Sequence, residues 1–186
     1  MPAAGPFPFI AGCLSLCFVD TLGGRGGAPV ERIGDRENFA RWLLAAGLAP
    51  ADVLPTQTDI EDAWALREAI YRAARAVMLS GAPAEADIAR INDAALAAPP
   101  RPQFSASGMR FVADAPVAAA FSAIAADAIA TLGKPGRLRE CPECRMLCLD
   151  TSRPGRRRWC SSAAGCGNRA KVRNHRARKA AMGEMQ

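Results

Sequence analysis

Cys141-Pro-Glu-Cys144, a basic spacer, and then Cys160 and Cys166-Gly-Asn-Arg169 decide the organisation of this 186-residue chain. The four cysteines form two close pairs, C-x2-C and C-x5-C, separated by 15 residues. Each pair forms one small chelate loop, and two loops complete a tetrahedral thiolate site. We therefore predict that Cys141, Cys144, Cys160 and Cys166 bind one zinc ion. Four thiolates leave no open coordination position, so the site is predicted to be structural.

Two other residues compete as ligands. Cys148 lies between Leu147 and Leu149, which indicates a short apolar strand in which the thiol packs as a small hydrophobe. His175 lies among arginines on a solvated helix. A disulfide or free thiols remain the alternative to zinc. Four arginines of the spacer are expected to offset the −2 charge of a Zn(Cys)4 centre: Arg153, Arg156, Arg157 and Arg158.

The positive charge of the chain is concentrated after the cysteines begin. Residues 1–136 carry 11 Lys and Arg against 14 Asp and Glu, whereas residues 137–186 carry 13 against 4. We expect Asn168 to be the N-cap of a basic helix over residues 169–181. Such a helix can lie in a major groove or follow phosphates, and it predicts a nucleic-acid partner. The predicted contacts are Arg156, Arg157, Arg158, Arg169, Lys171, Arg173, Arg176, Arg178 and Lys179.

The sequence before residue 136 predicts a mainly helical domain with a few strands. Alternating apolar residues over 7–22 favour a short buried strand, and Gly23–Gly27 a turn or hinge. We expect a strand or hairpin within 103–112 and a linker at Gly133–Gly136. The fold class is thus α+β: a domain over 1–135, then a small treble-like zinc finger over 136–186 that ends in the basic helix.

Four helices are predicted from their start signals and apolar spacing. The first is capped by Asp35 and ends at Gly47. The second begins at a capping box, Thr58–Glu61. Pro83 opens the third, with Ile88, Ile91 and Ala95 facing inward, and Asp114 caps the fourth, with Val117, Phe121, Ile124, Ala128 and Leu132 on one face.

Several classes of protein are disfavoured. The single histidine lies in the basic tail, so no Ser-His-Asp or Cys-His pair can form in the larger domain, and we predict no enzyme. Seven cysteines, an odd number, favour a reducing cytoplasmic location with metal-bound thiolates. No apolar run reaches the length of a membrane helix, and Ile10–Cys13 lacks the flanks of a lipoprotein signal. Cys13 and Cys17 are expected to be buried rather than redox-active.

The motifs Leu149-Asp-Thr-Ser152, Trp159-Cys-Ser161 and Cys166-Gly-Asn-Arg-Ala-Lys171 resemble the CGNR zinc-finger family. Leu16-Cys-Phe-Val-Asp-Thr21 is similar to the opening of the ABATE domain that precedes this finger, with Asp20 where Asn is usual. The resemblance implies a bacterial, stress-induced transcription regulator.

Our leading hypothesis is a DNA-binding transcription regulator whose N-terminal domain is a sensor or dimerisation unit. A homodimer and an unidentified small-molecule effector belong to this hypothesis, and a membrane partner does not. One alternative is a zinc-stabilised module that binds protein or RNA. The other is a small-molecule or redox sensor that does not read DNA directly.

Overall fold

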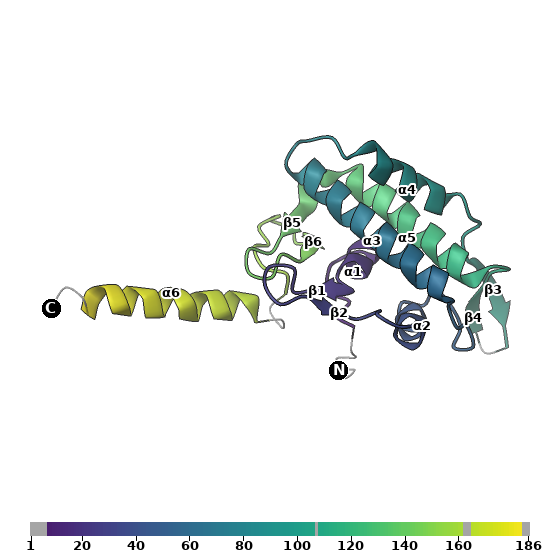
Figure 1. The fold of residues 1–186 in the computed structure, drawn as a ribbon, viewed down its shortest axis with the longest axis horizontal. Helices are drawn as coiled ribbons and strands as arrows, with labels where there is room; N and C mark the ends of the chain where they lie inside the picture. The colour runs from purple at the N-terminus through teal and green to yellow at the C-terminus, as the bar shows by residue number, and fades with distance from the viewer. Residues whose placement is uncertain (1–6, 107, 162–164, 184–186) are drawn as a thin grey trace.

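The computed structural model describes residues 7–106, 108–161 and 165–183, with the backbone alone from residue 180. Helices and paired strands alternate along the chain (Figure 1). The helices are α1 (Leu14–Val19), α2 (Arg36–Ala45), α3 (Gln57–Met78), α4 (Glu85–Ala95), α5 (Pro116–Leu132), the 3-10 helix η1 (Pro135–Arg137) and α6 (Cys166–Gly183). The strands are β1 (Leu22–Gly23), β2 (Val30–Glu31), β3 (Arg101–Ser105), β4 (Gly108–Val112), β5 (Leu138–Glu140) and β6 (Leu147–Leu149). They pair antiparallel as β1–β2, β3–β4 and β5–β6, which confirms the α+β class.

The N-terminal body is a helical layer built around α3. This helix packs against α1, α4 and α5, and α2 lies at one end of the group (Figure 1). Its apolar residues recur at helical spacing and enter a core with large, fully buried side chains such as Phe18, Trp42 and Ile124. The body therefore has enough apolar interior to fold around its own helices.

The strand predicted over residues 7–22 is wrong. Residues Leu14–Val19 form α1, and all but the first of its residues are buried. A buried six-residue run shows no polar face, so its alternation does not distinguish a strand from a helix. The hairpin expected within 103–112 is confirmed as β3–β4, with Gln103 opposite Arg110.

Helix starts were predicted with mixed success. Asp35 caps α2 as expected, since its carboxylate accepts a hydrogen bond from the backbone N–H of Asn38 at 2.7 Å, and Gly47 follows the helix with a φ of +70°. The capping box predicted at Thr58–Glu61 is wrong. Thr56 and Asp59 form the box instead, and α3 begins at Gln57.

Two further predictions about helices are corrected. Helix α4 starts at Glu85, after Pro83, and Ile88 is 43% exposed rather than inward-facing. Helix α5 is preceded by Ala115, which makes no side-chain cap, whereas Asp114 forms an ion pair with Arg101 at 3.1 Å. The Asp114 carboxylate, predicted to cap the helix, therefore pairs with Arg101 of β3 instead.

The C-terminal finger packs directly on the body. The backbone N–H of Leu149 in β6 donates to the carbonyl of Ala11 at 2.7 Å, and α1 contacts β6. The glycine-rich turn between β1 and β2 lies against the finger as well: a Cβ at Gly26 would come within 3.1 Å of the Glu143 carbonyl oxygen. Only α6 extends away from the body (Figure 1).

Candidate metal centre and basic helix

The first cysteine pair lies in the turn between β5 and β6. The N–H of Cys141 donates to the carbonyl of Met146, and the N–H of Arg145 donates back to the carbonyl of Cys141, both at 2.9 Å. These two bonds close a tight turn that keeps Cys141 and Cys144 side by side. Arg145 has a φ of +61°, which lets the chain reverse at this point.

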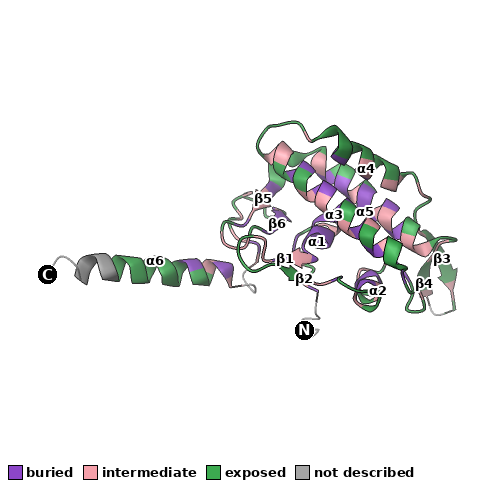
Figure 2. Ribbon diagram, in the orientation of Figure 1, coloured by how far each residue is buried: buried purple, intermediate pink, exposed green. Residues whose placement is uncertain are grey.

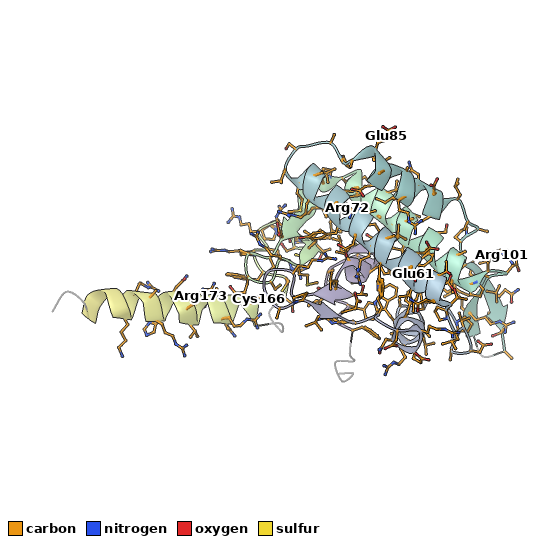
Figure 3. The ribbon with its side chains drawn as sticks, in the orientation of Figure 1. Glu61, Arg72, Glu85, Arg101, Cys166 and Arg173 are labelled. Atoms are coloured by element: carbon orange, nitrogen blue, oxygen red, sulfur yellow. The ribbon has the colours of Figure 1, made fainter. Side chains whose placement is uncertain are left out.

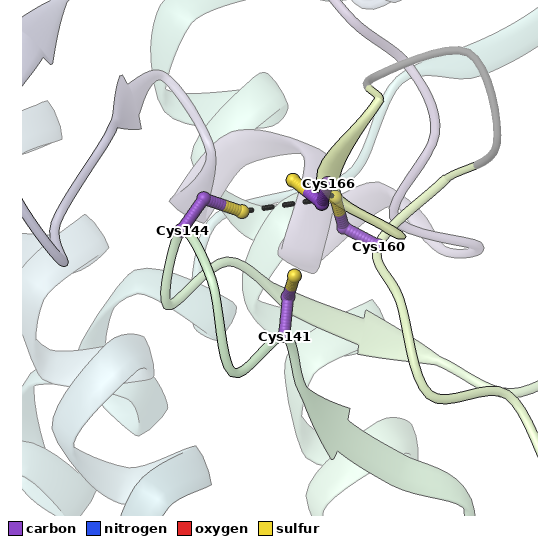
Figure 4. Close-up of side chains that lie close together, drawn as sticks. All are labelled: Cys141, Cys144, Cys160 and Cys166. Atoms are coloured by element: carbon purple, nitrogen blue, oxygen red, sulfur yellow. Dashed lines mark hydrogen bonds between the residues drawn. The ribbon is translucent and has the colours of Figure 1, made fainter. Parts of the chain in front are cut away.

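The second pair comes from another part of the finger. Cys160 lies in the connection between β6 and α6, and Cys166 is the first residue of α6. All four sulfurs lie within 4.8 Å of one another (Figure 4). The Sγ atoms of Cys144 and Cys160 are 3.7 Å apart, and those of Cys160 and Cys166 are 3.5 Å apart. Zinc with Zn–S bonds of about 2.3 Å needs sulfurs separated by about 3.8 Å, so the cluster fits the ion.

The ionisation of the thiols points in the same direction. Burial opposes ionisation of Cys141, but backbone hydrogen bonds from Cys144, Cys160 and Glu143 outweigh it and lower the pKa of Cys141 to about 7. Burial raises the pKa of Cys144 to about 12, and burial together with the neighbouring cysteines raises the pKa of Cys160. Four sulfurs this close cannot all become thiolates unless a cation lies among them.

Neither competing ligand belongs to the cluster. Cys148 lies in β6, is 1% exposed, and has a pKa raised by burial, as expected of a thiol that packs as a hydrophobe. His175 is exposed on α6, more than two turns beyond Cys166. The four predicted cysteines are therefore arranged to hold a metal ion, and Cys148 contributes to packing.

Two arginines of α6 connect the helix to the metal centre. The Nη2 atom of Arg169 lies 3.0 Å from the Sγ of Cys166, where it offsets thiolate charge. Arg173 donates both terminal nitrogens to the carboxylate of Glu143, at 2.7 and 2.6 Å, which lowers the pKa of Glu143. Cys166 lies at the end of α6 nearest the body, and Arg173 follows about two turns along the helix (Figure 3). The sequence analysis did not predict this role of Arg169, although three residues after Cys166 is nearly one helical turn.

The predicted N-cap at Asn168 is wrong. Helix α6 starts at Cys166, and the N–H of Arg169 already bonds to the carbonyl of Gly165 at 2.9 Å. Asn168 lies inside the first turn. With Cys166 at the first residue of α6, its sulfur lies among the other three.

Arg157, predicted to contact nucleic acid, is used inside the protein. Its guanidinium donates to the carbonyls of Ile10 at 3.0 Å, Trp159 at 3.0 Å and Leu149 at 3.3 Å. Its backbone N–H donates to buried Asp150 at 2.9 Å. The Ser152 hydroxyl and the other donors around Asp150 lower the pKa of this carboxyl to about 2. Arg157 thus holds the spacer loop against the N-terminal segment.

The other predicted basic contacts are accessible. Arg156 and Arg158 are exposed on the spacer loop, and residues 171–179 of α6 are exposed (Figure 2). The exposed cations of this helix are Arg169, Lys171, Arg173, Arg176, Arg178 and Lys179. Of these, Arg169 and Arg173 are turned toward the Cys141–Cys144 turn, and the other four have no carboxylate partner among the described residues.

The remaining candidates in the body are buried or half-buried. Cys13 precedes α1 and Cys17 lies within it, and burial raises the pKa of both thiols, which disfavours thiolate chemistry. Asp20 and Thr21 are 7% and 1% exposed, and Arg32 donates to the carbonyl of Asp20 at 2.7 Å. These groups form the polar end of the core beneath the β1–β2 turn.

The fold and the cysteine cluster define a zinc-finger protein of the treble-like type, joined to a mainly helical body. Residues 12–135 match the family model ABATE, described as "Putative stress-induced transcription regulator". Residues 137–179 match the model of the CGNR zinc finger. The chain therefore belongs to the ABATE family and carries a CGNR zinc finger, which confirms the resemblance seen in its motifs. The curated proteins give no significant match.

Both family descriptions name a regulator and a metal-binding module rather than a catalyst. Zinc is the metal of this finger family, and the four cysteines are arranged to hold it. In the part of the chain that the structure describes, no helix combines the length and apolar character needed to cross a bilayer.

Proposed function

We propose that this protein is a DNA-binding transcription regulator of the cytoplasm, without enzymatic activity, in which zinc holds a basic helix for contact with DNA. The observation that carries the proposal is the placement of α6. This helix starts at a cysteine of the metal cluster and then extends away from the body with its cationic side chains exposed (Figures 1 and 2). A basic helix with exposed cationic side chains is suited to a major groove.

We propose that residues 1–135 and residues 136–186 have separate roles. Cys141, Cys144, Cys160 and Cys166 bind zinc, and Arg156, Arg158, Lys171, Arg176, Arg178 and Lys179 contact phosphates or bases. Arg169 and Arg173 contribute mainly by fixing the direction of α6, because Glu143 and the Cys166 sulfur already engage their guanidinium groups. Arg157 is not among the proposed DNA contacts, because its guanidinium donates to three backbone carbonyls within the protein.

The body serves as a sensor or dimerisation unit in this proposal. The β3–β4 hairpin favours the second role: Phe104 and Met109 are paired across it, and they are 93% and 69% exposed. Large apolar side chains on one exposed sheet face are typical of a protein contact. Two copies would also double the few base contacts that one finger provides.

A salt titration of DNA affinity tests the proposal. Zinc-loaded protein and a mixed-sequence duplex are followed by fluorescence anisotropy between about 50 and 200 mM salt. With six cations at phosphates, log K falls against log salt with a slope of about −5. Arg176→Ala and Arg178→Ala together lower the slope by about 2, whereas Arg110→Ala, on the distant β4 strand, leaves it unchanged.

Absence of binding at the lowest salt, or a flat response to salt, contradicts DNA binding. Tighter binding to an RNA hairpin of equal length favours the RNA module instead. If Arg110→Ala weakens DNA binding as much as Arg176→Ala does, then binding depends on net charge and not on α6.

A further inference from the structure

An open cleft of about 700 Å³ lies between the spacer loop and the first turns of α6. This volume is within the range of about 300–1,000 Å³ that ligand sites occupy. Among the described residues, no Asp or Glu lines the cleft. The lining residues are Ile10, Arg157, Arg158, Trp159, Ser161, Gly167, Asn168 and Lys171.

The wall of the cleft is held in place by Trp159 and Gly167. A Cβ at Gly167 would come within 3.1 Å of the indole ring, so a larger residue there would displace the ring by a few tenths of an ångström, and glycine lets the helix lie close to Trp159. The guanidinium carbon of Arg158 lies 5.1 Å from the centre of the same ring. This cation–π contact leaves the charge of Arg158 intact while it limits the positions of the side chain.

The charge of the cleft is not cancelled by nearby acids. Glu143 is engaged by Arg173 and Asp150 by Ser152 and Arg157. Among the described residues, Arg158 and Lys171 form no ion pair with a carboxylate. Two free cations and one neutral amide therefore converge on one cleft, which is a donor set for a phosphate.

We propose that this cleft binds one phosphodiester unit of a nucleic-acid backbone. Arg158 and Lys171 pair with the phosphate, and Asn168 donates a hydrogen bond to a phosphate or sugar oxygen. The inference rests on the proposed function and deepens it, because it fixes where the backbone crosses the finger and gives Asn168 a binding role in place of the cap.

The cleft also selects the face of α6 that meets the nucleic acid. Lys171, His175 and Arg178 follow Asn168 at spacings of three, four and three residues, so they continue one face of the helix from the cleft outward. Arg169 and Arg173 lie on another face, which begins against Glu143. Arg176 continues this second face, so the cleft gives Lys171 and Arg178 the larger share of the contacts with the backbone.

Three cleft variants and one matched control test the proposal on full-length, zinc-loaded protein with a mixed-sequence duplex. We expect Arg158→Ala and Lys171→Ala each to reduce the magnitude of the salt slope by about 1. Asn168→Ala weakens binding about fivefold without changing the slope, since a lost neutral hydrogen bond releases no counterion. Arg153→Ala removes one exposed charge from the same loop outside the cleft and leaves the slope unchanged. Zinc content and circular dichroism confirm that each variant is folded.

The indole N–H signal of Trp159 gives a second measurement. In two-dimensional NMR spectra, assigned with Trp159→Phe, this signal shifts when duplex is added and less so in Lys171→Ala. A deoxynucleoside monophosphate shifts it only at far higher concentration. Saturation by the mononucleotide at the concentration needed for duplex would overturn the backbone assignment in favour of a free nucleotide.

The outcomes separate the two proposals. If wild-type protein binds duplex and the cleft variants keep its affinity and slope, the cleft proposal is overturned and the proposed function stands. If wild-type protein binds no nucleic acid at low salt, both are overturned.

Discussion

The four residues Cys166-Gly-Asn-Arg169 perform four different tasks within about one helical turn. The Cys166 sulfur joins the metal cluster, and Gly167 provides the space in which Trp159 packs. Asn168 lines the cleft, and Arg169 reaches back to the Cys166 sulfur. Spacing alone predicted the cysteine ligands, because chelate loops require it. It could not predict the tasks of Gly167 and Asn168, because these depend on Trp159 and the spacer loop, which only the folded finger brings near α6. The three-residue spacing of Arg169 from Cys166 was a signal for the remaining task.

Arg157 provides a test at the residue scale of structural against binding roles. We expect Arg157→Ala to lower the free energy of unfolding by about 2–3 kcal/mol, because three partly buried backbone carbonyls lose a charged hydrogen-bond donor. Arg156→Ala, one residue earlier and exposed, changes it by less than about 0.5 kcal/mol. Chemical denaturation measures both. Equal effects of the two substitutions would refute the structural role of Arg157.

Asp20 lowers the stability of the folded chain by an amount that depends on pH. Burial raises the pKa of Asp20 from 3.8 to about 6, although Arg32 and Arg25 oppose the shift. Between these values the folded state holds the proton more tightly than the unfolded state, so the contribution of Asp20 to stability falls as pH rises through that window. Above about pH 6 Asp20 is ionised in both states, and its destabilising effect is at its maximum.

Asp20→Asn removes this cost. We expect the variant to be more stable than wild type by about 2 kcal/mol at pH 8, with the difference vanishing toward pH 4. Comparing the two proteins by denaturant unfolding across this range isolates Asp20 from groups that both proteins share. A difference that stays constant with pH would show that Asp20 is not the titrating group.

At the scale of single elements, helix α1 shows where sequence patterns fail. Its six residues are too few to establish a 3.6-residue period, and the buried segment Ser15–Val19 has no solvent face that would reveal one. The longer α2, α3 and α5 were predicted because their apolar residues recur over several turns. Their ends were less certain, since Thr56 and Thr58 both precede an acidic residue three positions later.

The capping box of α3 can be tested with a matched pair of threonines. Thr56→Ala removes the hydroxyl that accepts from the backbone N–H of Asp59, so we expect a loss of about 1 kcal/mol in unfolding free energy. Thr58→Ala, exposed within the first turn, is expected to be neutral or slightly stabilising. A larger loss of stability in Thr58→Ala than in Thr56→Ala would favour the capping box at Thr58–Glu61 that the sequence predicted.

At the scale of the whole molecule, the finger and the body share one apolar core. Leu147, Cys141 and Cys160 pack in the same cluster of buried residues as Leu16 and Phe18. The charge asymmetry and the cysteine spacing predicted a finger with a basic helix. They contained no sign that the finger rests on the N-terminal segment, because the contacts of Ile10 and Ala11 are made by backbone carbonyls.

Removing zinc is therefore expected to affect the body. With excess chelator, the unfolding temperature of the whole chain falls by about 10 °C or more, as loss of several kcal/mol predicts for this size. Amide hydrogen exchange accelerates in α1, which contacts β6, as well as in α6. Faster exchange confined to residues after 136 would show that the two parts are energetically independent.

The zinc content of the purified protein tests the central claim, that four cysteines bind one zinc ion from which the basic helix starts. We predict one zinc per chain in wild type and in Cys148→Ser, and a large loss in Cys160→Ser. Less than about half a zinc per wild-type chain, with the four clustered thiols open to alkylation, would contradict the account.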